Sequence, residues 1–228
     1  QVSMNGPGVY YQDFNSLASA GAGVAWTDNL PTALMQGWYS NQTSYTADNG
    51  SMVSPGLYSY GTTNLDRALG SVSLFGFNMV YGARLQNTSA TTFGSLWVNY
   101  TGEQWRDGNL NNFSDQLLVE YSTNATSLFS GTWTSVPALT FNSPSNVGAF
   151  QIDGNLPANQ QVLQTTITGL NWTIGSEVWV RWSHLGNPSR HAMAIDDVHF
   201  QATPVPEPFG VTAMALGLGA AIRRRKNL

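Results

Sequence analysis

The sequence predicts an all-β protein, a jelly-roll β-sandwich followed by a short C-terminal apolar helix. Charged residues make up only 10% of the 228 residues, while aromatic residues make up 12% and include eight Trp. Short segments alternate apolar and polar residues between turns rich in Gly, Pro and Asn, and the body shows no ten-residue helical period. This composition favours strands over helices, and many short strands with polar turns are typical of sandwiches and barrels.

In chain order, the expected strands cover residues 9–17, 37–39, 69–75, 77–85, 93–101, 115–121, 162–167, 177–182 and 193–200. The alternation is clear in 177–182, where one face carries Val178, Val180 and Trp182 and the other carries Glu177, Trp179 and Arg181. The first strand lies near the start of the chain and the last lies just before the C-terminal tail, which suits a jelly roll. We therefore expect one domain over residues 1–204, because single all-β domains reach this size.

Composition also excludes several classes of site. The chain has no cysteine, so disulfides, thiolate metal sites and cysteine nucleophiles are excluded. Before Val205 there are five basic and twelve acidic residues, a net charge of −7. A body with this charge has no basic patch for phosphates, so we expect no nucleic-acid partner. The chain begins at Gln1 without an apolar leader, and we expect that a secretory signal peptide has been removed.

The tail, residues 205–228, has three parts in a fixed order. It begins with Val205-Pro206-Glu207-Pro208, continues through an uncharged run at 209–222, and ends in the basic residues Arg223, Arg224, Arg225 and Lys226. As a helix, the apolar run would reach roughly 21 Å, which is short of the roughly 20 residues that a full membrane span needs. The basic residues would stay on the cytoplasmic side. An ordinary anchor or a buried terminal helix is the alternative, but neither requires the Pro-Glu-Pro box.

This tail resembles the PEP-CTERM sorting signal of Gram-negative bacteria. The resemblance implies that the protein is secreted, contacts the inner membrane transiently through its C-terminal segment, and is processed near the Pro-Glu-Pro box by an exosortase. It also implies a final location on the cell surface or in the extracellular matrix. The body resembles lectin-like jelly rolls of PEP-CTERM surface proteins in the segments around Trp26, Gly37, Tyr100 and Ala194, which implies a fold and no established activity.

Asp196 and Asp197 in the last strand are the candidate metal ligands. They resemble the Ile-Asp-Asp-Val strand of jelly-roll adhesion and carbohydrate-binding domains that hold a structural Ca²⁺ between first and last strands. Calcium needs six to eight oxygen ligands, and Asp13 or Asn15 could supply the N-terminal side. The alternative is a buried, hydrogen-bonded carboxylate. Calcium that binds only the folded state would raise the midpoint of thermal unfolding.

Glu103, Trp105 and Arg106 form a candidate ligand-binding segment, which is expected to follow a strand directly. Trp105 could stack on a sugar ring while Glu103 and Arg106 bind its hydroxyl groups. The alternative is that Trp105 packs beneath the loop and Arg106 pairs with a neighbouring carboxylate.

Enzymatic activity is not expected. Glu120 and Glu177 could form a glycosidase pair only if their carboxyls lay within about 9.5 Å of each other, and the jelly-roll glucanase pattern Glu-x-Asp-x-x-Glu is absent. The three histidines, His184, His191 and His199, have no zinc-binding spacing and are expected on the surface or in loops. No Gly-x-Ser-x-Gly elbow supports a serine hydrolase.

Two functions therefore remain. The first is a non-enzymatic surface or matrix protein that self-associates, in a matrix or filament, through exposed strand edges. The second is a carbohydrate-binding module for an extracellular polysaccharide, with tryptophans near Trp105 or Trp182 as stacking platforms. A groove lined by aromatic rings with two or three polar groups would favour the second.

Overall fold

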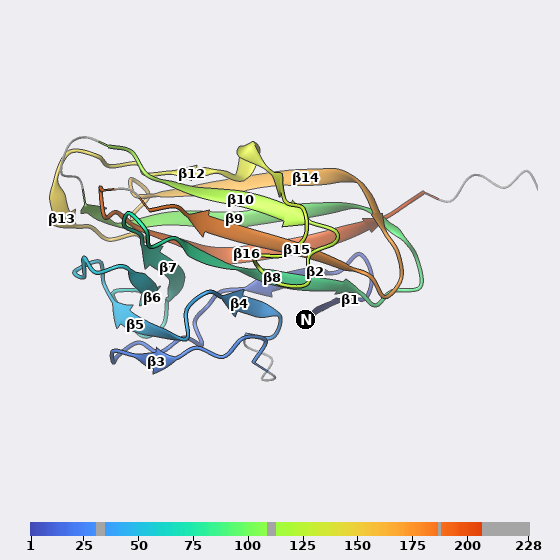
Figure 1. Ribbon diagram of the computed structural model, residues 1–228, viewed down its shortest axis with the longest axis horizontal. Helices are drawn as coiled ribbons and strands as arrows, with labels where there is room; N and C mark the ends of the chain where they lie inside the picture. The colour runs from blue at the N-terminus through green and yellow to red at the C-terminus, as the bar shows by residue number, and fades with distance from the viewer. Residues whose placement is uncertain (31–34, 109–112, 187, 207–228) are drawn as a thin grey trace, which may run out of the picture.

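The protein is a β-sandwich in the computed structural model, which describes residues 1–30, 35–108, 113–186 and 188–206 (Figure 1). Two mixed sheets pack face to face, which confirms the predicted fold class. The seven-stranded sheet has the order β1 (Val2–Met4), β8 (Met79–Asn87), β15 (Glu177–His184), β10 (Gln116–Ser122) and β11 (Thr134–Ser135), with β4 (Trp38–Ser40) beside β8 and β12 (Phe141–Asn142) beside β10.

The nine-stranded sheet contains the longest strands of the protein. Its order is β13 (Ala149–Gln151), β9 (Phe93–Gly108), β16 (Ala192–Pro204), β7 (Ala68–Val72), β6 (Gly56–Tyr60), β5 (Ser44–Asp48) and β3 (Val24–Ala25). In addition, β14 (Gln160–Trp172) pairs with β9, and β2 (Val9–Gln12) pairs with β16. A short 3₁₀ helix, η1 (Pro137–Leu139), closes the space between the sheets: Leu139 is fully buried, and its carbonyl accepts a hydrogen bond of 2.5 Å from the Tyr100 hydroxyl.

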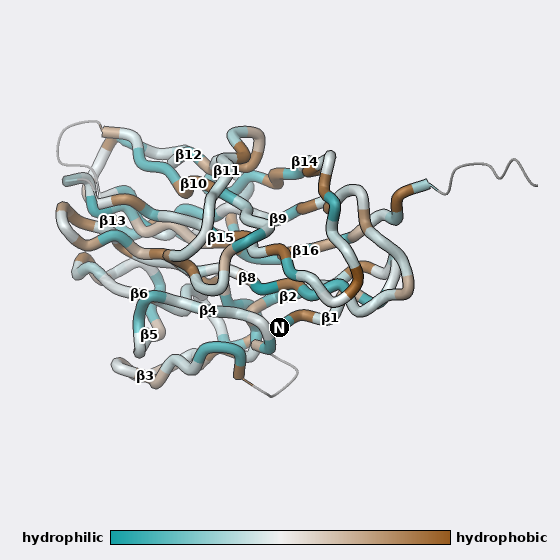
Figure 2. Tube along the Cα trace, turned by 45° about the vertical axis from the view of Figure 1, so that its right-hand side comes forward, coloured by the Kyte–Doolittle hydropathy of each residue, from teal (hydrophilic) through white to brown (hydrophobic). Residues whose placement is uncertain are grey.

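Aromatic side chains from both sheets meet in the core around Trp182. Its ring lies 5.8 Å from the Trp38 ring and 5.5 Å from the Tyr100 ring, and all three side chains are fully buried. Figure 2 shows hydrophobic and hydrophilic residues interspersed along the strands rather than gathered in one segment, as the alternation in the sequence predicts.

The two ends of the body lie side by side, because β2 pairs antiparallel with β16 from Gln12↔Val198 to Val9↔Gln201. The first strand is shorter than the predicted 9–17. Phe14 has a φ of +52°, and the side chains of Gln12 and Asp13 accept hydrogen bonds from the backbone N–H groups of the turn. A left-handed residue and local side-chain caps end the strand at this turn.

The last strand is longer than predicted and runs through Pro204, next to β9. Val205 continues this contact, because its N–H donates to the carbonyl of Thr92 at 3.0 Å. The predicted apolar helix and most of the sorting signal, from Glu207 onward, lie outside the described residues. Within the described ranges, no helix has the length and apolar character needed to cross a membrane.

Candidate functional site

The outer face of the seven-stranded sheet carries a groove of about 240 Å³. Three aromatic rings line it, together with polar and aliphatic side chains from two loops: Asp28, Tyr39, Ser40, Thr126, Ser127, Leu128, Phe129 and Trp179. Two larger hollows, of about 320 and 360 Å³, are lined by no aromatic ring and by one aromatic ring, respectively. The groove therefore combines aromatic rings with polar groups, as expected of a carbohydrate-binding module.

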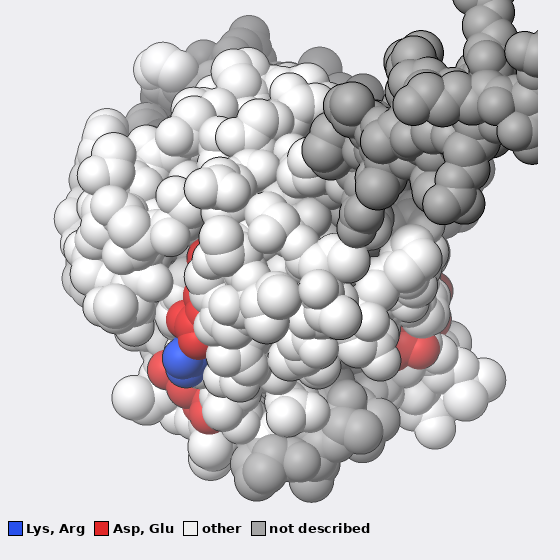
Figure 3. All heavy atoms as spheres, turned by 90° about the vertical axis from the view of Figure 1, so that its right-hand side faces the viewer, with Lys and Arg blue, Asp and Glu red and all other residues white. Residues whose placement is uncertain are grey.

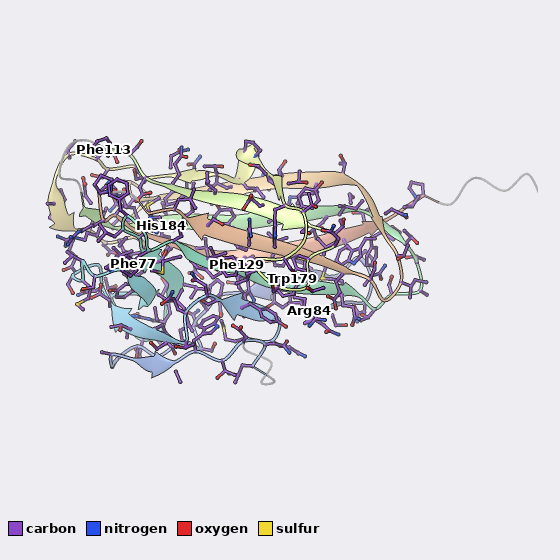
Figure 4. The ribbon with its side chains drawn as sticks, in the orientation of Figure 1. Phe77, Arg84, Phe113, Phe129, Trp179 and His184 are labelled. Atoms are coloured by element: carbon purple, nitrogen blue, oxygen red, sulfur yellow. The ribbon has the colours of Figure 1, made fainter. Side chains whose placement is uncertain are left out.

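Trp179 forms the floor of this groove. It lies on the outward row of β15, between Glu177 and Arg181, while its strand neighbours point into the core. Only 1% of its surface is exposed, and its ring lies 4.7 Å from the ring of Tyr39. The guanidinium of Arg84 lies 5.8 Å from the ring centroid of Trp179 and donates to the carboxylate of Glu177 at 2.5 and 2.8 Å (Figure 4). The floor is thus a packed aromatic pair with an ion pair at its side.

The loop at 123–133 forms one wall. The Ser130 hydroxyl accepts hydrogen bonds from the N–H groups of Thr126 and Ser127, both at 2.8 Å, and the Asn124 side chain accepts one from Thr132 N–H at 2.8 Å. Arg181 holds the loop from below by donating to the Leu128 carbonyl. The same guanidinium lies 3.9 Å from the ring centroid of Trp133. These contacts fix the loop before any ligand arrives.

Phe129 stands at the tip of that loop with 67% of its surface exposed, so its ring is available to a ligand. On the opposite wall, the carboxylate of Asp28 accepts hydrogen bonds from Trp26 Nε1 at 2.8 Å and from Ser40 N–H at 2.9 Å. An oriented carboxylate facing exposed and half-buried rings can bind a neutral molecule that has both C–H faces and hydroxyl groups.

The segment of Glu103, Trp105 and Arg106 lies elsewhere and is not a loop, because β9 continues through it to Gly108. Trp105 is fully buried, stacks on Tyr60 at 5.8 Å and donates to Glu103 at 2.8 Å. The backbone at Gly154 lies against its ring, where a Cβ would come within 2.4 Å of Nε1. Trp105 therefore packs beneath a loop, which is the alternative interpretation, and offers no ring face to a ligand here.

Arg106 bonds to backbone carbonyls rather than to a carboxylate. It donates to Gly50 at 3.3 Å and to Ala149 at 3.4 Å. Trp182, the second expected stacking platform, is a core residue with no exposed surface. Neither predicted platform is exposed; the rings that reach the surface of the groove are those of Tyr39 and Phe129, with Trp179 buried beneath them.

The predicted metal ligands come together at a junction in the nine-stranded sheet. On one side, β16 pairs with β7 up to Ile195 and then with β2 from Val198 onward. Asp196 and Asp197 lie in the short segment of β16 between these two pairings. Asp197 has a φ of +49° at an irregularity of the β16–β9 ladder. Asp13 follows β2 directly, so the fold does bring the two ends of the predicted site near each other.

The oxygens of these residues already have partners within the protein. Tyr11 donates to Asp197, Arg67 N–H donates to Asn15 at 2.7 Å, and Asn15 N–H donates to Asp13 at 3.1 Å. In the part of the chain that the structure describes, no three acidic or histidine side chains lie close enough to hold one metal ion. The calcium site therefore stays a prediction.

Two buried carboxyls occupy the same junction. Asp196 is 4% exposed, and burial together with Glu103 raises its pKa to about 10. Burial also raises the pKa of Glu103 to about 7. Without a cation, Asp196 is thus neutral at pH 7, and its Oδ1 accepts a 2.7 Å hydrogen bond from Asp197 N–H.

The glutamates considered for glycoside hydrolysis do not converge. Glu120 lies opposite Arg181 on β15 and forms an ion pair with it at 2.7 Å. Glu177 lies four residues before Arg181 in β15, so the two backbone positions are roughly 13 Å apart at about 3.3 Å per residue. Its carboxylate is held by a different arginine, Arg84, at 2.5 Å, so each glutamate forms a separate ion pair.

His184 is fully buried within β15, so its expected surface or loop location is wrong, whereas His191 lies in the loop before β16, as expected, but is fully buried there. His184 Nδ1 lies 2.9 Å from the Ser71 hydroxyl, and its Nε2 lies 2.9 Å from Asp115 Oδ2. This order resembles a catalytic triad, but Ser71 is also fully buried and lies within strand β7, where no substrate reaches it. The network joins β7, β15 and the start of β10 through buried hydrogen bonds.

Comparison with known proteins adds little at the level of sequence: no protein-family model and no curated protein matches the chain. Among solved structures, the CBM22-1 xylan-binding domain of Paenibacillus barcinonensis Xyn10C is 9% identical, with a TM-score of 0.41, covering 89% of this chain and 99% of that one. The K3 cleaved adhesin domain of Lys-gingipain from Porphyromonas gingivalis is 16% identical, with a TM-score of 0.42, covering 84% and 98%. The mannan-recognising module TmCBM27 is 11% identical, with a TM-score of 0.42, covering 85% and 96%.

Proposed function

We propose that this protein binds a neutral polysaccharide in the groove on the outer face of the seven-stranded sheet. The observation that carries the proposal is the pair of accessible rings, Tyr39 and Phe129, over the buried Trp179 and in the same groove as the oriented carboxylate of Asp28. Aromatic faces attract the C–H groups of a sugar ring, and a carboxylate accepts hydrogen bonds from its hydroxyls.

The electrostatics of the body favour a neutral glycan over an acidic one. The body carries a net charge of −7, and the groove lining contributes a carboxylate but no basic side chain. A polyanionic polysaccharide would meet like charge on approach, at a cost that rises as salt falls. Binding without hydrolysis also fits, because the lining holds one carboxylate where a glycosidase requires two.

Replacing Phe129 by alanine tests this proposal with little disturbance of the fold, because the ring is 67% exposed. We expect the affinity for a β-1,4-linked hexasaccharide of glucose, xylose or mannose to fall roughly tenfold, which corresponds to about 1.4 kcal/mol. Isothermal titration calorimetry measures the affinity, and thermal unfolding should be unchanged.

Phe77→Ala is the matched control, because Phe77 is 57% exposed and lies toward the other end of the sandwich (Figure 4). It should bind the same hexasaccharide as tightly as the parent protein. An equal loss of affinity in Phe129→Ala and Phe77→Ala would refute the proposal that this groove binds the glycan. Full binding by both Phe129→Ala and Tyr39→Ala would refute it as well.

We further propose that the body is exported and reaches the cell surface or the surrounding matrix after exosortase processing. The order of proline box, apolar run and arginines in residues 205–228 supports this. Intact-mass analysis of protein from the native cell surface should find a chain that ends near Pro206–Pro208. A chain extending to Leu228 in that fraction would contradict the proposal.

A further inference from the structure

Strand β14 is an unusually long open margin of the nine-stranded sheet. It has 13 residues and pairs with β9 through residues 160–168 and at Trp172, and no other strand of the described chain pairs with it. The other strands at sheet margins, β1, β2, β3, β4, β11, β12 and β13, have four residues or fewer. In Figure 1, β14 runs along the upper part of the sandwich. The alternate N–H and C=O groups directed away from β9 therefore have no strand partner in the described chain, and the one other element packed against β14 there is the three-residue η1.

This margin lacks the usual protection against pairing. Soluble β-proteins place lysine, proline, inward-pointing charges or bulges on open strands. Residues 160–172 contain no charged residue and no proline. The pairing with β9 is regular from Gln160 to Thr168, and the register shifts only beyond that point, where Gly169 has a φ of +73°.

The residues of β14 alternate sharply between two environments. Leu163 and Ile167 are buried, at 7% and 6% exposure, and lie opposite Tyr100 and Leu96 of β9. On the outward row, Gln164, Thr166 and Thr168 are exposed, and Val162 is 64% exposed. An added strand must keep this alternation, because a slip of one residue would turn its apolar side chains to solvent.

We infer that the occupant of this margin is β14 of a second copy of the same chain, antiparallel about a two-fold axis at Thr165. In that register Leu163 of each copy lies opposite Ile167 of the other, and Thr165 faces its own counterpart. Outside, Gln164 lies opposite Thr166, and Val162 lies opposite Thr168. On the inward row apolar Leu163 thus meets apolar Ile167, and on the outward row polar Gln164 meets polar Thr166, while Val162 meets the methyl-bearing side chain of Thr168; such cross-strand pairs stabilise sheets.

Charge argues for the same occupant. The net charge of −7 makes two bodies repel each other as they approach, whereas β14 itself brings no charged side chain to the contact. The view in Figure 3, toward the right-hand end of the molecule, likewise shows a face that is largely uncharged, with charged atoms in small groups. Because each chain offers one long margin, pairing about a two-fold closes into a dimer. It does not extend into the filament that the sequence suggests.

Single-cysteine variants of the full chain test the register directly, since the chain has no cysteine of its own. In Thr165→Cys the two residues would lie directly opposite each other across the axis with Cα atoms about 4.5–5.5 Å apart, within the Cα–Cα range of a disulfide. In Thr168→Cys they would lie six residues out of register, roughly 20 Å apart. Under mild oxidation we expect most Thr165→Cys chains to become cross-linked dimers and Thr168→Cys chains to stay near background. Equal cross-linking of both, or of neither, would overturn the inference.

Two variants of opposite charge on β14 distinguish this contact from association through the apolar tail. The double variants Gln164→Lys/Thr166→Lys and Gln164→Glu/Thr166→Glu alter exposed side chains only, and they keep the tail. Light scattering should find each variant alone at the monomer mass and an equimolar mixture at the dimer mass. Variants that stay dimeric alone, or a mixture that stays monomeric, would count against the β14 contact. The outcome is independent of glycan binding, which Phe129→Ala reports.

Discussion

Replacing Trp182 by alanine is expected to lower the free energy of unfolding by about 3–5 kcal/mol, the usual cost of deleting a buried tryptophan. Trp182 has no exposed surface and contacts rings from both sheets: Trp38 at 5.8 Å, Tyr100 at 5.5 Å and Phe200 at 6.5 Å. Its removal leaves a cavity that rigid strands on both sides cannot fill. Chemical denaturation measures the change, and the midpoint of thermal unfolding should fall by roughly 10 °C.

Trp97→Ala is the matched control for this prediction. Trp97 lies on β9 but is only partly buried, and the nearest ring is that of His199, 6.3 Å away. Its loss should cost clearly less than the loss of Trp182. A similar cost for both tryptophans would show that the core is not centred on Trp182.

Replacing Asp115 by alanine is expected to lower the free energy of unfolding by about 3 kcal/mol or more, because it removes the carboxylate that accepts hydrogen bonds from buried polar groups. Asp115 is 3% exposed and accepts hydrogen bonds from His184 Nε2 at 2.9 Å, Ser189 Oγ at 3.2 Å and Gln116 N–H at 2.8 Å. Asp115→Asn keeps the size of the side chain and one oxygen acceptor, so its cost should be smaller. Denaturation of both variants at pH 7 measures the difference.

The same residue predicts a dependence on pH. Burial acts to raise the pKa of Asp115, but His184 and the hydrogen bonds outweigh it, so the pKa lies below its usual value. A lowered pKa means that Asp115 stabilises the fold above its unfolded pKa of about 3.9, and that this contribution is lost as the pH falls through the folded pKa. We therefore expect a steeper loss of stability below about pH 4 in the parent protein than in Asp115→Asn. Parallel curves for the two would contradict this account.

Periodicity predicted the fold class and the two faces of single strands. In 177–182 the alternation correctly separated core residues such as Val180 and Trp182 from Trp179 on the outer face. It could not show how far a strand continues. β9 runs on through Glu103 and Trp105 because β16 on one side and β13 and β14 on the other pair with that end, and no local pattern encodes partners so distant in the sequence.

The candidate groove depends on contacts between distant parts of the chain. Asp28, Tyr39, Phe129 and Trp179 come from four segments that only the folded sheet brings together. The one local signal was Trp179 itself, a large aromatic residue between two charged ones on an outward row. His184 was misplaced for the same reason, since its partner Asp115 lies 69 residues earlier in the chain.

The place of β16 in the nine-stranded sheet also sets the order in which the protein can fold. This strand lies between β9 and β7, and it is the last strand that the structure describes. The sheet is complete only when residues 192–204 have paired with the strands on both sides. Long-range pairing of this kind is slow to form. Until β16 pairs, β9 and β7 each keep an unpaired edge, the arrangement that invites pairing with other chains.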